Sequence, residues 1–462
     1  MLVGMDYTDY FKGKKITAMG LGLLGRGIGD VAYMAEAGAA EIIVTDLKDA
    51  DALASSVEKL QQYDNVKFVL GEHRLEDFAN RDLILVAPSV PLDSPYVAHG
   101  VETGARKVQS AALFAELTKI PIIGVTGTRG KSTTSAMIHH VLQVVTGEEV
   151  IYGGTVRDVS NLQLLKQVKE DSIAVFELDS WQLQGWGWAG ISPQVSVFTN
   201  FMEDHLNYYQ KGEMTKEQGM QAYFKDKAQI FLHQEDSGVL IITPDVFERA
   251  KLLPGTTLGQ EVILADASAI PEDCLLAMPG EHNRLNAALA YEALKATGLT
   301  EDEIFEGLAS FSGVEGRLQL VGTVDNVRIY NDNNATTPQA TIAALKALDL
   351  GNKNIILIAG GADKKIELPQ LTAAIEEHCK QVILIPGTGT DLLRSALQPA
   401  EKNSTIDCTI LSVENLVQAV EEARLAAGNG DIILFSPAFA SFGQYKNEYE
   451  RNDEFMSLVE NI

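Results

Sequence analysis

The strongest chemical signal in this 462-residue chain is a glycine-rich stretch, Gly124 to Thr133, that also carries a lysine and hydroxyl side chains. Backbone N–H groups of such a stretch turn toward phosphate oxygens, and the lysine adds positive charge. A serine hydroxyl can ligate the magnesium that accompanies a nucleoside triphosphate. We therefore predict a phosphate-binding loop. Its predicted nucleotide contacts are Gly124, Gly127, Thr128, Gly130, Lys131, Ser132 and Thr133.

The chain around this loop supplies the context that the motif requires. The apolar run 120–123 precedes it as a strand, and a helix with one apolar side follows it. The apolar residues of that helix are Met137, Ile138, Val141, Leu142 and Val145. The loop is a variant, because Val125 stands where the common pattern has glycine. The alternative interpretation is a strand-to-helix turn in which Gly-Lys-Ser is incidental.

Candidate metal ligands follow two other predicted strands. Glu177 ends the apolar strand 173–177, and His205 comes directly after the strand 195–200. Magnesium needs only one or two carboxylates beside nucleotide phosphates, and Glu177 is the best candidate for this role. His205 could ligate a second ion, although a hydrogen-bonded structural histidine is an equal alternative.

Two further segments carry weaker signals. Lys227 has no chemical pattern around it, and taken alone it predicts a solvated helix residue. His282, Asn283 and Asn286 lie in the segment 280–286 and could hydrogen-bond a base or ribose. The same segment could equally be the start of a helix capped by an asparagine.

The first hundred residues contain a second glycine-rich turn. The turn Gly20-Leu21-Gly22-Leu23-Leu24-Gly25 follows a predicted strand at 15–19, and Asp46 follows a second strand at 42–45. This βαβ unit with an acid about twenty residues on resembles a dinucleotide fingerprint. A further strand is predicted at 83–86.

The length of the chain suggests about three domains. After residue 316 the pattern restarts with a strand at 327–330, a helix at 337–348, a strand at 355–358 and a closing strand at 432–435. We therefore predict three α/β domains: a Rossmann-like domain at 1–109, a P-loop ATPase-like domain at 110–316, and a second Rossmann-like domain at 317–462.

Composition excludes several classes of protein. A formal charge of −26 would repel nucleic acids and anionic membranes, while small anions can still bind at local clusters of cations. The start of the chain lacks the features of a signal peptide, and no stretch is apolar enough to span a membrane. Three widely spaced cysteines fit a reducing compartment and exclude a thiolate zinc cluster. We expect a cytoplasmic monomer that acts on small molecules.

Segments along nearly the whole chain match, in order, the motifs of one family. They are Gly124 to Thr133, Glu177 to Gln182, Asn200 to His205, Gly280 to Asn286, Tyr330 to Thr337, Gly360 to Lys364, and Ser436 to Phe455. The chain thus resembles the Mur ligases. Within that family it is most similar to the members that join D-glutamate to UDP-N-acetylmuramoyl-L-alanine in peptidoglycan precursor synthesis.

The resemblance implies roles for the candidate ligands. Lys131 and Ser132 would hold the ATP phosphates and a first magnesium ion together with Glu177. His205 would bind a second magnesium ion. Lys227 falls where the family has a carbamylated lysine that supports the metal site. These four positions, Lys131, Glu177, His205 and Lys227, are the implied catalytic residues.

The resemblance also implies binding residues in all three domains. Nucleotide contacts are implied for Asn283, Asn286, Arg317 and Asp332. Substrate contacts are implied for Leu23, Leu24, Asp46, Thr155, Gln182, Lys364 and Ser441. The implied reaction converts a carboxylate to an acyl phosphate with ATP, after which the amine of the amino acid attacks and phosphate leaves. We expect the third domain to be mobile, because both substrates and ATP must meet away from water.

Several positions depart from the family pattern. Around the nucleotide precursor, Ser89 and Thr155 differ from the usual residues, and Arg157 could add a charged contact to the pyrophosphate. Asp179 replaces a serine near the metal ligands. In the third domain the departures are Gly316, Asn334 and Glu448, where histidine, lysine and phenylalanine are frequent. Losing a lysine and gaining a glutamate should weaken binding of an acidic amino acid.

Other functions stay open at this point. A ligase of the same kind could take another amino acid or a modified nucleotide precursor. The turn at 20–25 could instead bind a nicotinamide cofactor and make the chain an oxidoreductase. A nucleotide-binding protein without catalysis is the remaining alternative.

Overall fold

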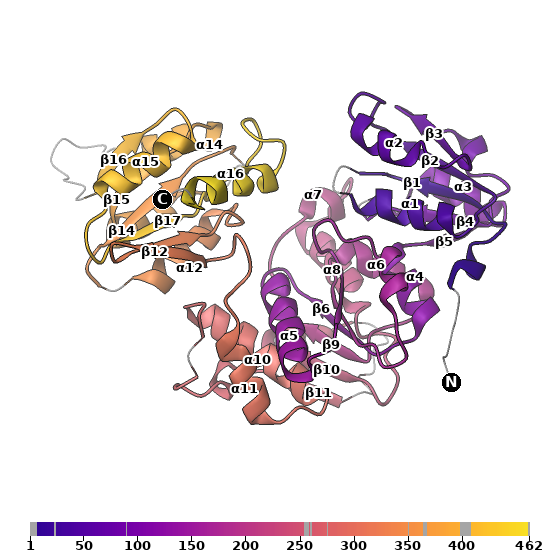
Figure 1. The fold of residues 1–462 in the computed structure, drawn as a ribbon, viewed down its shortest axis with the longest axis horizontal. Helices are drawn as coiled ribbons and strands as arrows, with labels where there is room; N and C mark the ends of the chain where they lie inside the picture. The colour runs from indigo at the N-terminus through magenta and orange to yellow at the C-terminus, as the bar shows by residue number, and fades with distance from the viewer. Residues whose placement is uncertain are drawn as a thin grey trace. The chain divides into compact units, whose positions relative to one another are not determined.

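Three β-sheets with flanking helices make up the protein (Figure 1). The computed structural model describes residues 7–22, 25–88, 90–253, 258, 261–274, 276–349, 351–363, 367–397 and 408–460. The chain forms two compact units, of which the first is Met1–Ala269 with Ala288–Gly307 and the second is Ile270–Ala287 with Leu308–Ile462. The predicted α/β class is confirmed. The domain boundaries near residues 109 and 316 stay a prediction.

The first sheet is parallel throughout, with the strand order β3-β2-β1-β4-β5. Its strands are β1 (Lys15–Met19), β2 (Glu41–Asp46), β3 (Val66–Leu70), β4 (Leu83–Val86) and β5 (Arg106–Val108). Its helices are α1 (Arg26–Glu36), α2 (Ala54–Leu60) and α3 (Pro95–Glu102), with short 3₁₀ turns at Tyr7–Tyr10 and Leu75–Asp77. The strand order is that of a doubly wound sheet, in which ligands bind where the order reverses.

The second sheet is also parallel, with the order β11-β10-β9-β6-β8-β7. Its strands are β6 (Ile122–Thr126), β7 (Ile151–Gly154), β8 (Ala174–Glu177), β9 (Val195–Phe198), β10 (Val239–Ile242) and β11 (Glu261–Leu264). Strand β6 therefore lies between β8 and β9. Because parallel strands end at the same edge of a sheet, the residues that follow these three strands can meet there.

The helices between residues 110 and 310 include α5, the helix that was predicted to follow the loop. They are α4 (Ser110–Thr118), α5 (Lys131–Thr146), α6 (Ser180–Ala189), α7 (Leu206–Tyr209), α8 (Lys216–Ala228), α9 (Pro244–Ala250), α10 (Glu281–Lys295) and α11 (Glu301–Ser310), with 3₁₀ turns at Gln163–Gln167 and Ala267–Ala269. Helix α5 buries Met137, Ile138, Val141 and Leu142, as its apolar pattern predicts, while Val145 is half-buried.

One hydrophobic core joins the first and second sheets. It contains Ile16 and Val44 from the first sheet, Phe176 from the second, and Phe114 from α4 between them. Hydrogen bonds also cross this boundary, since Asp30 of α1 accepts from the hydroxyl of Ser160 at 2.6 Å. The two sheets of the first unit therefore share one hydrophobic core.

The third sheet has the order β12-β13-β17-β14-β15-β16. Its strands are β12 (Gln319–Val324), β13 (Val327–Asn331), β14 (Ile355–Ala359), β15 (Cys379–Leu384), β16 (Thr409–Ser412) and β17 (Ile432–Phe435). All pairs are parallel except β12 with β13, which form a hairpin around Asp325 and Asn326, both at positive φ. The predicted closing strand β17 lies at the centre of the sheet, and the edge strand β12 was not predicted.

Helices cover both faces of the third sheet. They are α12 (Pro338–Leu348), α13 (Pro369–His378), α14 (Thr388–Leu397), α15 (Leu416–Ala426) and α16 (Glu448–Glu460). One apolar cluster contains side chains of α12, α13 and α14, and a separate cluster contains those of α15 and α16. The sheet is thus buried on both faces, as parallel sheets usually are.

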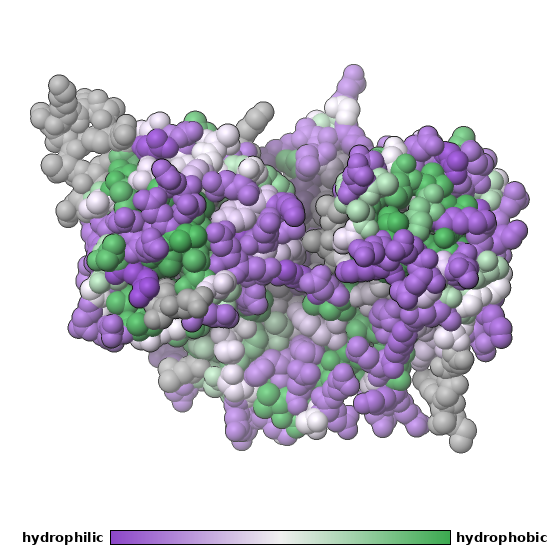
Figure 2. Space-filling model, turned by 45° about the horizontal axis from the view of Figure 1, so that its top comes forward, coloured by the Kyte–Doolittle hydropathy of each residue, from purple (hydrophilic) through white to green (hydrophobic). Residues whose placement is uncertain are grey.

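The face of the molecule in Figure 2 is predominantly hydrophilic. Figure 2 shows polar side chains over most of the face in view, with apolar side chains in separate small groups. Among the described residues, no helix combines the length and the apolar character needed to cross a membrane.

Candidate active site

The predicted phosphate-binding loop begins later than the sequence indicated. Strand β6 continues through Gly124 and Val125, so the loop itself is Gly127–Gly130. The prediction that Gly124 belongs to the loop is therefore wrong, because Gly124 lies in strand β6. A Cβ at Gly124 would clash with the ring of Pro193, so this glycine allows close packing beside the sheet. Val125, the departure from the common motif, is a buried strand residue.

Two glycines shape the loop. Gly127 has a φ of 148°, and a Cβ there would clash with the hydroxyl of Thr199. Gly130 has a φ of 82° and is the N-cap residue of α5, which starts at Lys131. Both conformations favour glycine over residues with a Cβ. The helix therefore begins directly at the loop, where its first N–H groups have no partners inside the helix.

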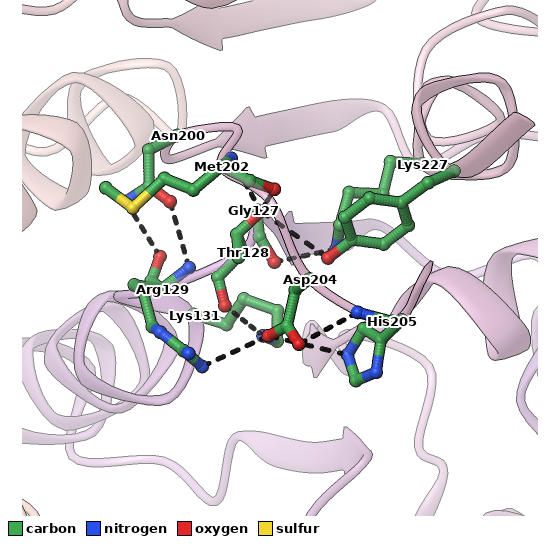
Figure 3. Close-up of polar contacts among 10 residues, drawn as sticks. Gly127, Thr128, Arg129, Lys131, Asn200, Met202, Asp204, His205 and Lys227 are labelled. Atoms are coloured by element: carbon green, nitrogen blue, oxygen red, sulfur yellow. Dashed lines mark hydrogen bonds and ion pairs between the residues drawn. The ribbon is translucent and has the colours of Figure 1, made fainter. Parts of the chain in front are cut away.

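Residues that follow β9 hold the loop in place (Figure 3). Asn200 accepts the N–H of Arg129 at 2.9 Å through Oδ1 and donates through Nδ2 to the carbonyl of Arg129 at 3.1 Å. The N–H of Thr128 donates to the carbonyl of Asn200 at 2.9 Å. The hydroxyl of Thr128 accepts from the N–H of Met202 at 3.0 Å. The loop conformation is thus fixed by the neighbouring strand.

The start of α5 has the features of an anion site. Lys131 is half-buried, and its Nζ donates to the carbonyl of Thr128 at 3.2 Å. Ser132 and Thr133 follow in the first helical turn, which contains no acidic residue. The positive end of the helix dipole and the Lys131 ammonium group together favour a phosphate here.

Lys227, from α8, lies beneath this loop. Its side chain is buried, and its Nζ donates to the carbonyl of Gly127 at 2.7 Å and to Thr126 Oγ1 at 3.4 Å. Burial holds the pKa of Lys227 well below its ordinary range, and the charge of Lys131 lowers this pKa further. Taken alone, the sequence predicted a solvated helix residue, and that interpretation is wrong. The carboxylates of Asp179, Asp204 and Glu177 oppose this lowering of the Lys227 pKa.

His205 completes the group that the sequence predicted. It follows β9 in a left-handed conformation, and Asp204 Oδ1 accepts its backbone N–H at 2.9 Å. Its ring packs against Trp181 at a centroid distance of 4.8 Å. Burial lowers the pKa of His205, and the charges of Lys227 and Lys131 add to this effect while Asp204 opposes it. The imidazole is therefore neutral near pH 7, which is the form that binds metals.

Glu177 and its neighbours lie at the end of β8. Glu177 is buried, and its carbonyl accepts the N–H and the hydroxyl of Thr155 at 2.8 and 3.0 Å. The same hydroxyl lies 3.2 Å from Oε1 of Gln182. The two residues that were predicted to contact the substrate are therefore neighbours. Asp179 accepts the N–H of Gln182 at 2.7 Å and so caps α6. A serine at this position could make the same cap.

The side chains of this group fit a magnesium ion. The Ser132 hydroxyl and the Glu177 carboxylate are the oxygen ligands that this ion prefers, whereas His205 offers only an imidazole nitrogen. No cluster of three or more His, Cys, Asp or Glu side chains suited to a metal occurs in the described part of the chain.

The carboxylate of Asp46 binds the backbone of the glycine-rich turn in the first sheet. Its Oδ2 accepts the N–H groups of Leu21 and Gly22 at 2.9 and 3.3 Å, and its Oδ1 accepts the N–H of Lys48 at 2.9 Å. The predicted substrate residues Leu23 and Leu24 lie outside the described residues, as does Ser89. Arg157 is partly exposed and pairs with Asp158 at 3.3 Å.

Two predicted nucleotide contacts lie near the start of α10. Asn283 and Asn286 are buried, and Asn283 donates from Nδ2 to the carbonyl of Pro279 at 2.9 Å. Asn286 in turn donates to Asn283 Oδ1 at 3.3 Å. The segment is a helix start, as the alternative interpretation held. However, α10 begins at Glu281, so neither asparagine is the residue that precedes the helix.

Asp332 and Ser441 are both buried in the second unit. Asp332 accepts the N–H of Leu318 at 3.0 Å and the hydroxyl of Ser436 at 2.7 Å. Burial raises the pKa of Asp332 to about 7, against these two hydrogen bonds and the nearby charge of Arg317. Lys364, the other predicted amino-acid contact, lies outside the described residues.

The departures in the second unit lie around Asn333. Asn333 donates from Nδ2 to Oδ1 of Asn334 at 3.3 Å and to the carbonyl of Glu448 at 2.9 Å. A Cβ at Gly316 would lie 3.1 Å from Nδ2 of Asn334. A larger residue at 316 would therefore crowd Asn334. The departures at 316, 334 and 448 form one local arrangement.

Comparison with known proteins identifies the family. Residues 125–255 match the Mur ligase middle domain, and residues 316–439 match the Mur ligase glutamate ligase domain. UDP-N-acetylmuramoylalanine–D-glutamate ligase of Roseiflexus sp. is 34% identical and covers 97% of this chain and 99% of its own length. The chain belongs to the Mur ligase family. The ligase of the same name from Clostridioides difficile is 30% identical, over 98% of this chain and 99% of its own.

Solved structures of Mur ligases share the fold. UDP-N-acetylmuramate–alanine ligase from Thermotoga maritima matches with a TM-score of 0.59 at 17% identity, over 97% of this chain and 99% of that one. The MurF ligase of the same organism matches with a TM-score of 0.56 at 15% identity, over 98% and 96%. The fold is therefore that of the Mur ligases along nearly the whole chain.

The residues that hold the loop were not predicted from the sequence. Asn200 begins the family motif that ends at His205, and Arg129 and Asp204 carried no predicted role of their own. Their signal was their position directly after a buried strand, where polar residues of open α/β sheets gather. Only the strand order, with β9 beside β6, brings them to the loop.

Proposed function

We propose that this Mur ligase uses ATP to join D-glutamate to UDP-N-acetylmuramoyl-L-alanine through an acyl phosphate. The observation that carries the proposal is the loop Gly127–Gly130 with Lys131, Lys227 and His205 around it. Relatives that match along the full length and bear the name of this activity support the choice of substrates. The free cysteines fit a cytoplasmic site of action.

The chain's own residues would bind ATP and offset its charge. The loop amides and the start of α5 bind the phosphates, and Lys131 balances the charge that shifts as the terminal phosphoryl group moves to the carboxylate. Ser132, Glu177 and His205 would hold up to two magnesium ions, which supply Lewis-acid stabilisation of that charge. Asn283, Asn286, Arg317 and Asp332 are proposed nucleotide contacts.

The remaining substrates would be held by residues at other strand ends. Thr155 and Gln182 are proposed to contact the nucleotide precursor, with Leu23, Leu24 and Asp46 near its base. Ser441 and Lys364 are proposed to hold the amino acid. Its amine attacks the acyl phosphate carbonyl, the carbon–oxygen bond to phosphate breaks, and phosphate leaves as the amide forms.

Lys227 is proposed to act as a carbamate. Burial lowers the pKa of its amine, which favours the unprotonated form that adds to carbon dioxide. The addition would form an N–C bond and release one proton, and the new carboxylate would support the metal site. The contacts that support this idea are the hydrogen bonds to Gly127 and Thr126 and the position beside Lys131. A charged ammonium group would be costly to bury here.

One assay tests the proposal. Purified protein is incubated with ATP, magnesium, UDP-N-acetylmuramoyl-L-alanine and a panel of D- and L-amino acids, and phosphate release and adduct mass are measured. We expect phosphate release and the matching adduct with D-glutamate. A strong preference for another amino acid would contradict the substrate assignment while leaving the ligase class intact.

A second candidate is the same reaction with a different amino acid. The departures at Asn334 and Glu448 favour it, because asparagine supplies no positive charge where lysine is frequent, and Glu448 carries a carboxylate where phenylalanine is frequent. Both changes should weaken binding of an acidic amino acid, while Arg451, which donates to Asn333, stays as a cation beside them. The panel in the assay above separates the two candidates directly.

A further inference from the structure

Arg129 is a cation of the phosphate-binding loop that the proposed mechanism does not use. It lies between Thr128 and Gly130, and its side chain is about half exposed, with 51% of its surface accessible. Its guanidinium group pairs with Asp204 through Nη1 and Oδ2 at 3.4 Å (Figure 3). A 3.4 Å pair with this much exposure is weak, because water competes for both groups.

The backbone of Arg129 is held by three hydrogen bonds. The N–H and carbonyl of Arg129 bind the side chain of Asn200 at 2.9 and 3.1 Å, and the hydroxyl of Thr199 donates to the same carbonyl at 2.5 Å. Arg129 is therefore fixed beside the start of α5, while its long side chain keeps its freedom to turn.

Asp204 is shared between two partners. Its Oδ1 accepts the N–H of His205, and its Oδ2 lies 3.8 Å from Nε2 of His205 as well as near Arg129. The carboxylate thus places a negative charge beside the loop that carries Arg129 and is followed by Lys131. A phosphate bound at the loop would offer Arg129 a stronger, bidentate partner than Asp204 does.

We propose that Arg129 is a second phosphate-binding cation of the loop, and that Asp204 competes with the nucleotide for its guanidinium group. When a triphosphate binds, Arg129 turns from Asp204 to the phosphate oxygens, and Asp204 is left with His205. The inference rests on the proposed binding of ATP at this loop. It adds Arg129 to the residues that bind phosphate, and it assigns Asp204 a role that weakens nucleotide binding.

A double-mutant cycle tests this competition. ATP binding is measured by calorimetry, in EDTA and at fixed ionic strength, for the unmodified chain, Arg129→Gln, Asp204→Asn and the double variant. Arg129→Gln should weaken binding about tenfold, because a charge-assisted hydrogen bond is lost. Asp204→Asn should tighten binding about two- to fivefold, which is the strength of an exposed ion pair. In the Arg129→Gln background that gain should vanish.

A neighbouring carboxylate provides the matched control. Glu203 is adjacent in sequence but pairs with Lys216 of α8 at 2.5 Å. Glu203→Gln removes the same charge from the same segment, and it should change ATP affinity less than Asp204→Asn does. Equal gains for the two variants, or a gain from Asp204→Asn that persists without Arg129, would overturn the competition.

Two outcomes separate this inference from the proposed function. If the unmodified chain binds no ATP even with magnesium, the proposed function itself fails. If it binds ATP but Arg129→Gln binds equally tightly, only the role of Arg129 fails. Should Asp204→Asn not fold, as judged by circular dichroism, Arg129→Lys decides. This variant should keep more affinity than Arg129→Gln, and equal affinities would overturn the proposal.

Discussion

The protein contains two glycine-rich turns that join a strand to a helix, and they are closed in opposite ways. In the first sheet, the N–H groups of Leu21 and Gly22 bind the carboxylate of Asp46. In the second sheet, the N–H of Arg129 binds the neutral amide of Asn200, and Lys131 follows. The backbone N–H groups of the first turn thus bind a carboxylate, whereas the N–H of Arg129 in the second turn binds a neutral amide.

This difference teaches that a local glycine pattern does not define a phosphate site. A phosphate at the first turn would have to displace or approach a buried carboxylate, which like-charge repulsion opposes. An acid in this place is part of the dinucleotide fingerprint, so Asp46 alone does not decide the ligand of the first turn. Phosphate binding is assigned to the second turn because Lys131 follows it at the start of α5. The side chain that binds the backbone of each turn comes from the end of a neighbouring strand. Asp46 is the last residue of β2, and Asn200 follows β9.

Removing the charge of the second turn should have the largest effect. We expect Lys131→Ala to lower the turnover of phosphate release about a thousandfold, because the loop loses its compensation for the transferring phosphoryl group. Lys169→Ala, an exposed lysine of the same unit, is the control and should leave turnover unchanged. A loss below tenfold would contradict the assignment of Lys131.

Lys227 should give the next largest effect. We expect Lys227→Ala to lower turnover about a hundredfold, with partial recovery in acetate, since a small carboxylate could replace the carbamate. Lys225→Ala changes an exposed lysine of the same helix and should have little effect. A carbamate would also appear as a carbon-13 resonance after incubation with labelled bicarbonate. Full activity of Lys227→Ala would rule out its proposed role.

Asp46 tests the other side of the comparison. Asp46→Ala removes the acceptor for three backbone N–H groups and should lower the free energy of unfolding by about 2 to 3 kcal/mol. Urea denaturation measures this change, with exposed Asp64→Ala as the control. ATP affinity should stay the same, because the second turn does not involve Asp46. A parallel loss of ATP affinity would show that the two turns are coupled.

Asp332 can be compared with Asp46. It accepts the backbone N–H of Leu318, whereas Asp46 accepts three backbone N–H groups. The pKa of Asp332 is about 7 in the folded chain, above its value when unfolded, so its contribution to stability is lost as pH rises from about 4 to 7. Asp332→Asn removes this loss. Relative to the unmodified chain, it should gain about 2 kcal/mol of unfolding free energy between pH 5 and pH 8. An identical pH dependence of both proteins would contradict the raised pKa.

Much of the fold was predictable because its strands are short apolar runs with clear ends. The strands at 15–19, 83–86 and 432–435 agree with β1, β4 and β17. The position of β17 at the centre of its sheet was not predictable, since strand order depends on contacts between distant segments. The edge strand β12 was missed because its residues are mostly half-buried or exposed, without a continuous apolar run.

The roles of the candidate site residues stay predictions, while the structure shows contacts that the sequence did not indicate. Lys131, Glu177, His205 and Lys227 are brought into one electrostatic neighbourhood. The burial of Lys227 could not be read from α8, whose hydrophobic residues do not mark one clear face. Gly124 was placed in the loop because glycine marks turns, yet here it makes room for Pro193 beside the strand.

The sequence by itself determined the α/β class, the phosphate-binding loop and membership of the Mur ligases, because these depend on apolar periodicity and on short motifs. The tertiary structure decided which side chain closes each glycine-rich turn. Asn200 and Arg129 are 71 residues apart, and Asp46 and Leu21 are 25 apart. Such pairs meet only because parallel strands that are neighbours in a sheet end at the same edge.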